Sequence, residues 1–299
     1  MCGLLLAMTV CSSSTGCVWS ASRWLNRSNT SEELAKEARY AEDRGETGQA
    51  EQLLRRAVKS DPENCEARRE FCEVLIRNGN LEAAGEQLRR VIEQNPDDPR
   101  GYVQLAQILS QRGKVTDADL VLDIALDLDP NNADALWLKG RVEEFRNRPE
   151  HALERYHRVL QTSPDHVDSR LRIAAIQLKN GHADQASAML RSVLDSQTLE
   201  QSQRVAATWQ LGSAYAQTGR WNEAASLLSS VTHLRPMPAD DWYRVAFACH
   251  RAGDLAQAQR AAQAAVQSQP DFAPARSLLA QLSASPAGSP AIQTASGVR

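Results

Sequence analysis

Hydrophobic residues between positions 205 and 238 recur at intervals of three and four, with polar residues between them. Leu211 and Tyr215 mark one such stripe, and Ala224 and Leu228 mark a second. A period of about 3.6 residues places each set on one face of a helix, so this stretch predicts two short amphipathic helices. One helix pair cannot bury both of its apolar faces, and the pattern therefore implies neighbouring pairs of the same design.

The same design recurs along the chain at intervals of 34 residues. A residue that tolerates positive φ separates the two helices of each copy. This turn position holds Gly45, Gly79, Gly113, Asn147, Gly181, Gly219 and Gly253. A small residue marks the expected crossing point of the two helices, at Ala38, Cys72, Ala106, Gly140, Ala174, Gly212 and Ala246. A second alanine column keeps the same phase, at Ala50, Ala84, Ala118, Ala152, Ala186, Ala224 and Ala258. A closing proline recurs at Pro62, Pro96, Pro130, Pro164, Pro236 and Pro270.

These columns resemble the tetratricopeptide repeat (TPR), a helix-turn-helix unit of 34 residues. The resemblance covers residues 31–272 as seven repeats, namely 31–64, 65–98, 99–132, 133–166, 167–200, 205–238 and 239–272. It implies an all-α fold, a right-handed α-solenoid of seven TPR units with a concave, ligand-facing groove. The same scaffold serves many binding functions, so the resemblance specifies the fold more closely than the function.

Two places depart from the regular repeat. The fifth repeat lacks its closing proline, and four additional residues, 201–204, precede the sixth repeat. These residues either lengthen a loop or extend a helix, and the sequence does not say whether they form a hinge. After the last repeat, residues 273–282 continue the first-helix pattern and predict a capping helix. Residues 283–299 are rich in Pro, Ala, Ser and Gly without a period, which is typical of a disordered tail.

The N-terminus carries a candidate export signal. Residues 3–10 form an apolar run that is too short to span a bilayer but is typical of a secretory signal core. The following STGC resembles a bacterial lipoprotein box, with Cys17 as the lipidated residue, although Ser14 replaces the usual leucine and no basic residue precedes the run. We therefore expect a signal over 1–17 and a polar tether over 18–30. The alternative is a disordered leader with incidental cysteines, or a wrongly assigned start.

Composition narrows the function classes. The net charge is −3 and no basic stripe is present, which argues against nucleic-acid binding. No P-loop, GxGxxG or GxSxG motif occurs, and the six histidines lack HExxH-type spacing. The repeats account for all of 31–272, so no segment remains for a catalytic domain. We expect no enzyme activity, no cofactor and no metal site.

The cysteines do not predict a disulfide framework. Cys65 and Cys72 lie seven residues apart on one predicted helix, which separates them by about 10 Å, too far for a disulfide. Cys72 and Cys249 occupy packing columns and are interpreted as small buried residues.

The resemblance also implies which residues face the groove, mainly those at repeat positions 2, 5, 9, 12 and 13. Position 5 is apolar from the third repeat onward, which predicts a row that contacts an apolar or peptide ligand. The candidate residues are Arg69, Val103, Gln107, Trp137, Arg141, Phe145, Leu171, Trp209, Tyr243 and Phe247. Trp209 is expected near the centre of the groove. The alternative is that position 5 packs between repeats.

The sequence therefore favours a non-catalytic scaffold that binds a partner protein or peptide and is held at the cell envelope by Cys17. Charges of both signs occupy the groove positions, and the Lys and Asn that clamp acidic chaperone tails in related repeats are absent. A soluble cytoplasmic adaptor and a self-assembling structural protein remain alternatives. The partner and the oligomeric state are not specified by the sequence.

Overall fold

A computed structural model describes residues 14–284, and this part of the chain contains fifteen helices and no strand. The helices are α1 (Ser14–Asp43), α2 (Thr47–Ser60), α3 (Cys65–Arg77), α4 (Leu81–Gln94), α5 (Pro99–Gln111), α6 (Val115–Leu128), α7 (Ala133–Phe145), α8 (Pro149–Thr162), α9 (Val167–Lys179), α10 (Ala183–Leu194), α11 (Gln201–Gln217), α12 (Trp221–Ser230), α13 (Ala239–Ala252), α14 (Leu255–Ser268) and α15 (Ala273–Ala284). Seven helix pairs followed by one more helix match the predicted all-α arrangement, including the capping helix over 273–282.

Two segments predicted from the sequence lie largely outside the described residues. They are the expected signal, as far as residue 13, and the expected tail, from residue 285 onward. Within 14–284, no helix is long and apolar enough to cross a membrane.

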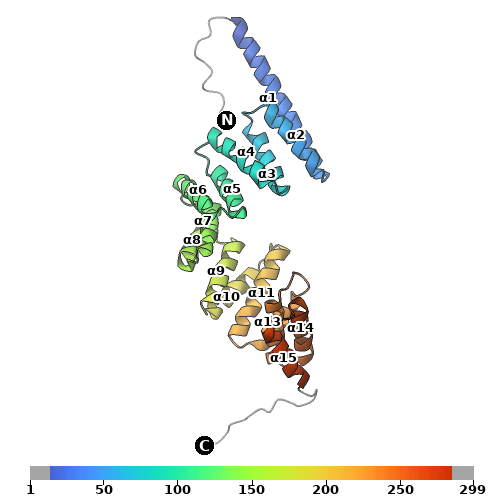
Figure 1. Cartoon of the computed structure of the whole chain (residues 1–299). Helices are drawn as coiled ribbons and strands as arrows, with labels where there is room; N and C mark the ends of the chain where they lie inside the picture. The colour runs from blue at the N-terminus through green and yellow to red at the C-terminus, as the bar shows by residue number, and fades with distance from the viewer. Residues whose placement is uncertain (1–13, 285–299) are drawn as a thin grey trace, which may run out of the picture. The chain divides into compact units, whose positions relative to one another are not determined.

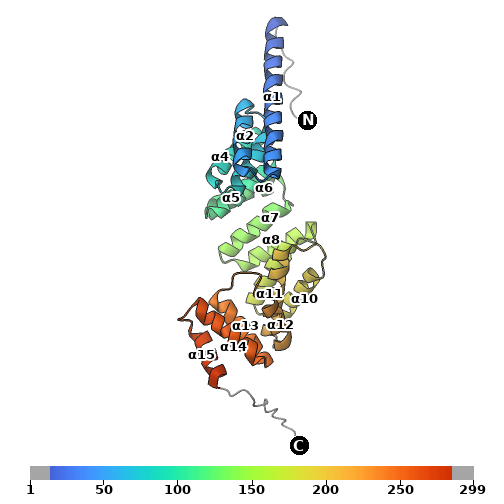
Figure 2. The same ribbon diagram turned by 90° about the vertical axis from the view of Figure 1, so that its right-hand side faces the viewer.

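The described residues fall into two compact bodies, an N-terminal body that ends at Val159 and a C-terminal body that begins at Leu160. Within the N-terminal body, consecutive helices from α1 to α7 pack against each other (Figure 1). Within the C-terminal body, α9 to α15 do the same, and α11 also contacts α9 (Figure 2). Each body has a hydrophobic core of its own.

The turns between paired helices have the predicted backbone conformation. Six turn glycines have φ between 74° and 84°, and Asn147 has a φ of 57°. Positive φ costs a residue with a Cβ atom conformational energy, which explains why glycine or asparagine occupies every one of these turns.

The small-residue column marks close helix crossings, as expected. A Cβ atom added at Gly140 would lie 2.5 Å from Cε1 of Tyr156, and one added at Gly212 would lie 2.8 Å from Cγ of Leu228. Both distances are far shorter than any van der Waals contact. The absence of a side chain therefore allows α7 to approach α8, and α11 to approach α12.

Side-chain caps begin several of the first helices. Asn64, Asp98 and Asn132 each accept a hydrogen bond from a backbone N–H of the helix that follows, at 3.0–3.1 Å. Pro99 stands at the first position of α5, where a missing N–H costs nothing.

The N-terminal end of the array differs from the expectation. Residues 18–30, expected as a polar tether, belong to the 30-residue helix α1. No glycine or proline occurs between Gly16 and Gly45, so nothing in the sequence stops the helix over this distance. Figures 1 and 2 both show α1 extending beyond the end of α2. Cys17 lies within the first turns of this helix.

The four additional residues, 201–204, extend a helix and do not lengthen the loop, since α11 begins at Gln201 and has 17 residues. Gln203 fixes this extra turn in two ways. Its Oε1 accepts a hydrogen bond from the backbone N–H of Glu200 at 3.4 Å. Its Nε2 donates to Oδ1 of Asp168 in α9 at 3.2 Å. The second helix of this repeat, α12, has only 10 residues.

The described cysteines that occupy packing columns are buried, as predicted. Cys72 lies in the core of the N-terminal body and Cys249 in that of the C-terminal body, each with 1% of its surface exposed. Burial raises the pKa of the Cys72 thiol to about 12 and also raises the pKa of Cys249. Both thiols are therefore kept in the neutral form at physiological pH.

Candidate functional site

The predicted groove residues are divided between the two bodies. The N-terminal body holds Arg69, Val103, Gln107, Trp137, Arg141 and Phe145, and the C-terminal body holds Leu171, Trp209, Tyr243 and Phe247.

Three of the N-terminal candidates do not form a binding surface. Val103 is 8% exposed and belongs to the hydrophobic core, so its role is packing. Arg69 donates a hydrogen bond from Nη2 to Oδ2 of Asp98 at 2.6 Å, which links α3 to the start of α5. Gln107 is exposed, but it lines none of the depressions described for this part of the chain.

The remaining N-terminal candidates, Trp137, Arg141 and Phe145, follow one face of α7 at intervals of four residues. The Arg141 guanidinium carbon lies 5.2 Å from the Trp137 ring centroid, a cation–π contact. Phe145 at the end of the helix is 75% exposed, the highest exposure among the large hydrophobic residues described.

A separate depression of the N-terminal body is polar. It has a volume of about 750 Å³ and lies between α1 and the residues that lead into α3. Its lining carries both signs of charge, with Glu32, Lys36, Arg39 and Glu63 among the residues concerned. Its lining exposes about as much polar as apolar surface, whereas an apolar ligand prefers a mostly apolar lining.

The C-terminal body holds the more promising set. Leu171 is 7% exposed and packs in the core, so the packing alternative holds for it, as it does for Val103. Trp209, Tyr243 and Phe247 are partly exposed and line two depressions, one beside α11 and the other among α11, α12 and α13.

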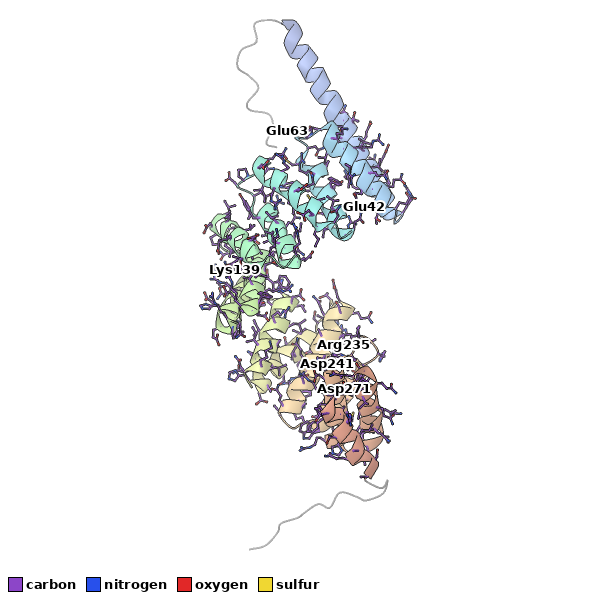
Figure 3. The ribbon with its side chains drawn as sticks, in the orientation of Figure 1. Glu42, Glu63, Lys139, Arg235, Asp241 and Asp271 are labelled. Carbon is purple, nitrogen blue, oxygen red and sulfur yellow. The ribbon has the colours of Figure 1, made fainter. Side chains whose placement is uncertain are left out.

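The first depression, with a volume of about 570 Å³, lies between the first turns of α11 and the loop that follows α12. Trp209 forms one wall, and the Arg235 guanidinium carbon stacks over its ring at 4.1 Å from the centroid. Arg235 is held in place by Asp241, because its Nη2 lies 2.6 Å from Oδ2 of that carboxylate (Figure 3). Leu234, which is 43% exposed, adds apolar surface from the loop.

The second depression, of about 370 Å³, lies among α11, α12 and α13. Its aromatic wall is continuous. The Trp221 and Phe247 rings meet edge to face with centroids 5.7 Å apart, and Tyr243 follows at 6.1 Å from Phe247. Tyr243 in turn packs edge to face on Phe272, with centroids 5.8 Å apart. These separations are those of favourable aromatic pairs.

Sequence reasoning missed several residues of these depressions. Trp221 lies at the start of α12 and Arg235 in the loop after it, and both positions fall outside the groove columns of the repeat. Phe272 closes the last repeat. The available signal was compositional: Trp221 and Phe272, like Trp209, come from the last two repeats, in a chain with only 5% aromatic residues.

Among the residues that the structure describes, no three His, Cys, Asp or Glu side chains come together as metal ligands would. The two depressions of the C-terminal body offer aromatic surfaces and guanidinium groups.

Comparison with solved structures gives proteins of the same fold. A tetratricopeptide repeat protein from Parabacteroides merdae ATCC 43184 is 16% identical, with a TM-score of 0.60, over 85% of this chain and 99% of that one. Pseudomonas aeruginosa PilF is 16% identical, with a TM-score of 0.64, over 73% of this chain and 97% of that one. YrrB, described as a TPR protein with an unusual peptide-binding site, is 23% identical, with a TM-score of 0.54, over 64% and 97% of the two chains.

A search of curated proteins found no match. Two family models described as tetratricopeptide repeat do match the sequence, one over residues 41–107 and 146–207 and the other over residues 103–167. Together the matches run without interruption from 41 to 207, across both bodies. The helix pairs, the turn residues and the close helix crossings agree with them, and the chain belongs to the tetratricopeptide repeat family.

Proposed function

We propose that this chain is a non-catalytic scaffold and that the face formed by α11 and α13 binds a segment of a partner protein. One observation carries the proposal: four aromatic side chains remain partly exposed in two depressions, Trp209 in one of about 570 Å³, and Trp221, Tyr243 and Phe247 in one of about 370 Å³. Concave, mostly apolar sites of this size are typical of ligand binding.

The energetics favour this face over the other candidates. Partly exposed aromatic rings lose little conformational freedom on binding and bury a large apolar area, so they dominate binding free energies. Arg235 already holds the Trp209 ring in place, which reduces the ordering cost of binding. YrrB, a TPR protein with an unusual peptide-binding site, is consistent with a peptide ligand for the same fold.

A displayed library of random linear peptides tests the proposal. The immobilised full chain should enrich peptides that share a large apolar residue. In fluorescence anisotropy titrations, the double variant Tyr243→Ala/Phe247→Ala should bind the enriched peptides at least about tenfold more weakly, because truncation of an anchoring aromatic residue costs about 2 kcal/mol. Leu255→Ala is the matched control, since Leu255 is 44% exposed in the same body but lines neither depression.

Circular dichroism spectra should show that all variants keep the helical content of the wild type. If the enriched peptides bind the aromatic variant as tightly as the wild type, the α11–α13 face is not the binding site. A library that yields no enriched peptide would remove the proposal itself.

We further propose that Cys17 anchors the chain at the cell envelope through attached acyl chains. The support is the apolar run over 3–10 and the STGC that follows it. Metabolic labelling with a palmitate analogue in a bacterial host should mark the wild type and Cys11→Ala, but not Cys17→Ala. Equal labelling of both variants would leave the chain without this anchor and favour a soluble adaptor.

A further inference from the structure

The second depression points to a more specific ligand. We propose that it binds a peptide segment in which a large apolar side chain stands next to a carboxylate. This inference rests on the proposed function and narrows the class of partner that the α11–α13 face recognises.

The apolar half of the ligand follows from the wall of the depression. Trp221, Phe247 and Tyr243 present ring surfaces toward the same space, and Leu228 closes it from α12. A bulky aliphatic or aromatic side chain that enters this space replaces water on several rings at once, which a small or polar side chain cannot do.

The carboxylate follows from two arginines on α13. Arg244 lines the depression, three residues before Phe247. Arg251, four residues after Phe247, lies with its guanidinium carbon 4.8 Å from the Trp221 centroid and 6.0 Å from the Phe247 centroid. Residues three and four apart share a helix face, so the two cations stand on either side of the Phe247 ring.

Neither arginine has an ion-pair partner within residues 29–284, whose side chains the structure describes. The neighbouring arginines do: Arg235 pairs with Asp241, and Arg220 pairs with Glu223 at 2.8 Å. No carboxylate lines the depression. Asp254, the first acidic residue after Arg251, is engaged as the N-cap of α14, where it accepts a hydrogen bond from the backbone N–H of Gln257 at 3.0 Å.

An apolar wall flanked by two cations without a counter-ion is complementary to an apolar group flanked by an anion. Guanidinium groups form short, charge-assisted and often bidentate hydrogen bonds with carboxylates, and the low polarity of the wall strengthens them. The carboxylate could belong to an acidic side chain or to the C-terminus of a partner, and the experiment below separates the two.

The probes are the peptides that the display experiment enriches. They should carry Asp or Glu within a few residues of the shared apolar residue. Synthetic versions are made with that acid replaced by its amide, and with the C-terminus either free or amidated. If the bound carboxylate is an acidic side chain, replacing it by its amide should weaken peptide binding to the wild type about tenfold. If the bound carboxylate is the C-terminus, amidation of the C-terminus should weaken binding by the same factor.

The protein variants assign the effect to the two arginines. In Arg244→Gln/Arg251→Met, replacement of the acid should change the affinity by less than about twofold, because the cations that read it are gone. Arg191→Gln, an exposed arginine of α10 without an ion-pair partner, should behave as the wild type. Raising the salt concentration should weaken binding to the wild type more than to the double variant.

The outcomes separate this inference from the proposed function. Enriched peptides without any acid, or a tenfold acid effect that persists in the double variant, would overturn the inference and leave the binding face intact. If no peptide is enriched, both fail together.

Discussion

Gly212 sets the distance between the two helices of the sixth repeat. A Cβ atom at this position would lie 2.8 and 2.9 Å from Cγ and Cδ2 of Leu228 and 3.3 Å from Cβ of Leu227. The helices must therefore separate, or Leu228 must leave its rotamer. We predict that Gly212→Ala lowers the free energy of unfolding by about 1–3 kcal/mol, although alanine has the higher helix propensity.

Gly48→Ala provides the contrast. This glycine lies in α2, has an ordinary φ, and has no heavy atom within 4 Å of the position that a Cβ would take. The substitution should leave stability unchanged or raise it by up to about 1 kcal/mol. Urea unfolding followed by circular dichroism measures both variants. Equal effects at the two positions would show that α11 and α12 are not in close contact at Gly212.

A partly buried ion-pair network ties α6 to α7. Nζ of Lys139 lies 2.5 Å from an oxygen of Asp119 and 2.5 Å from one of Asp123 (Figure 3 labels Lys139). Nη1 of Arg146 lies 2.6 Å from the other oxygen of Asp119. Burial by itself raises the pKa of Asp119, but the hydrogen bonds from Lys139 and Arg146 outweigh burial and hold the pKa below its usual value of 3.8.

This shift predicts a pH dependence. Because the folded state lowers the pKa of Asp119, its carboxylate stabilises the fold fully above the unfolded pKa, and this contribution is lost as the pH falls through the folded value. Asp119→Asn should therefore be less stable than the wild type at about pH 7, and the difference should shrink below about pH 4. Urea unfolding at a series of pH values measures it. Asp97→Asn, at an exposed carboxylate, should show no such gap, and a gap for Asp119→Asn that widens in acid would contradict the assignment.

At the scale of single elements, α6 differs from every other second helix of the array. Leu120, Ile124 and Leu128 are 62%, 44% and 39% exposed and follow each other at intervals of four residues. The positions equivalent to Leu120 and Ile124 in the other repeats hold polar residues or alanine, and in the second and fourth repeats they hold a glutamate and an arginine. The exposed stripe is thus a property of this helix and not of the repeat.

An apolar stripe of this kind favours association between copies. We predict that the weight-average mass of the wild type rises with concentration in light scattering, and that Leu120→Glu/Ile124→Arg stays monomeric with an unchanged circular dichroism spectrum. Leu255→Ala, at an exposed apolar residue elsewhere, should associate as the wild type does. A wild type that is monomeric at every concentration would refute the prediction.

Most elements could be predicted because the repeat specifies them locally. The turn position accepts only residues such as Gly219 or Asn147 that tolerate positive φ, so a single column locates the boundary between the two helices of each repeat. The start of α1 could not be read in the same way, because the sequence has no closing proline before Pro62 to mark it. The two readings of residues 201–204 remained open because a helix turn and a loop accept the same polar residues.

The candidate site was predicted only in part, for a related reason. The position 5 column identified Trp209 and Tyr243, but it also contains Val103 and Leu171, which pack in the cores. Burial depends on how closely neighbouring repeats approach, and the column does not encode that distance. Trp221 and Arg235 come from a helix start and a loop, where no periodic pattern applies.

At the scale of the whole molecule, the two hydrophobic cores are separate sets of residues. The aromatic depressions belong to the C-terminal body, and the exposed stripe of α6 belongs to the N-terminal body. The proposed ligand binding and the predicted association between copies are thus assigned to different cores, so a variant designed for one property leaves the other as an internal control.

The added turn of α11 shows where this architecture accepts new sequence. Its extra residues precede Val205, so every packing residue from Leu211 onward keeps its phase relative to α12. Growth at the N-terminal end of a first helix changes its length and leaves the register of the array intact, whereas an insertion inside the helix would rotate all later side chains away from their partners. The residues before α11 are thus a natural graft point, at which an epitope or a spectroscopic label can be introduced without redesign of the repeats that follow.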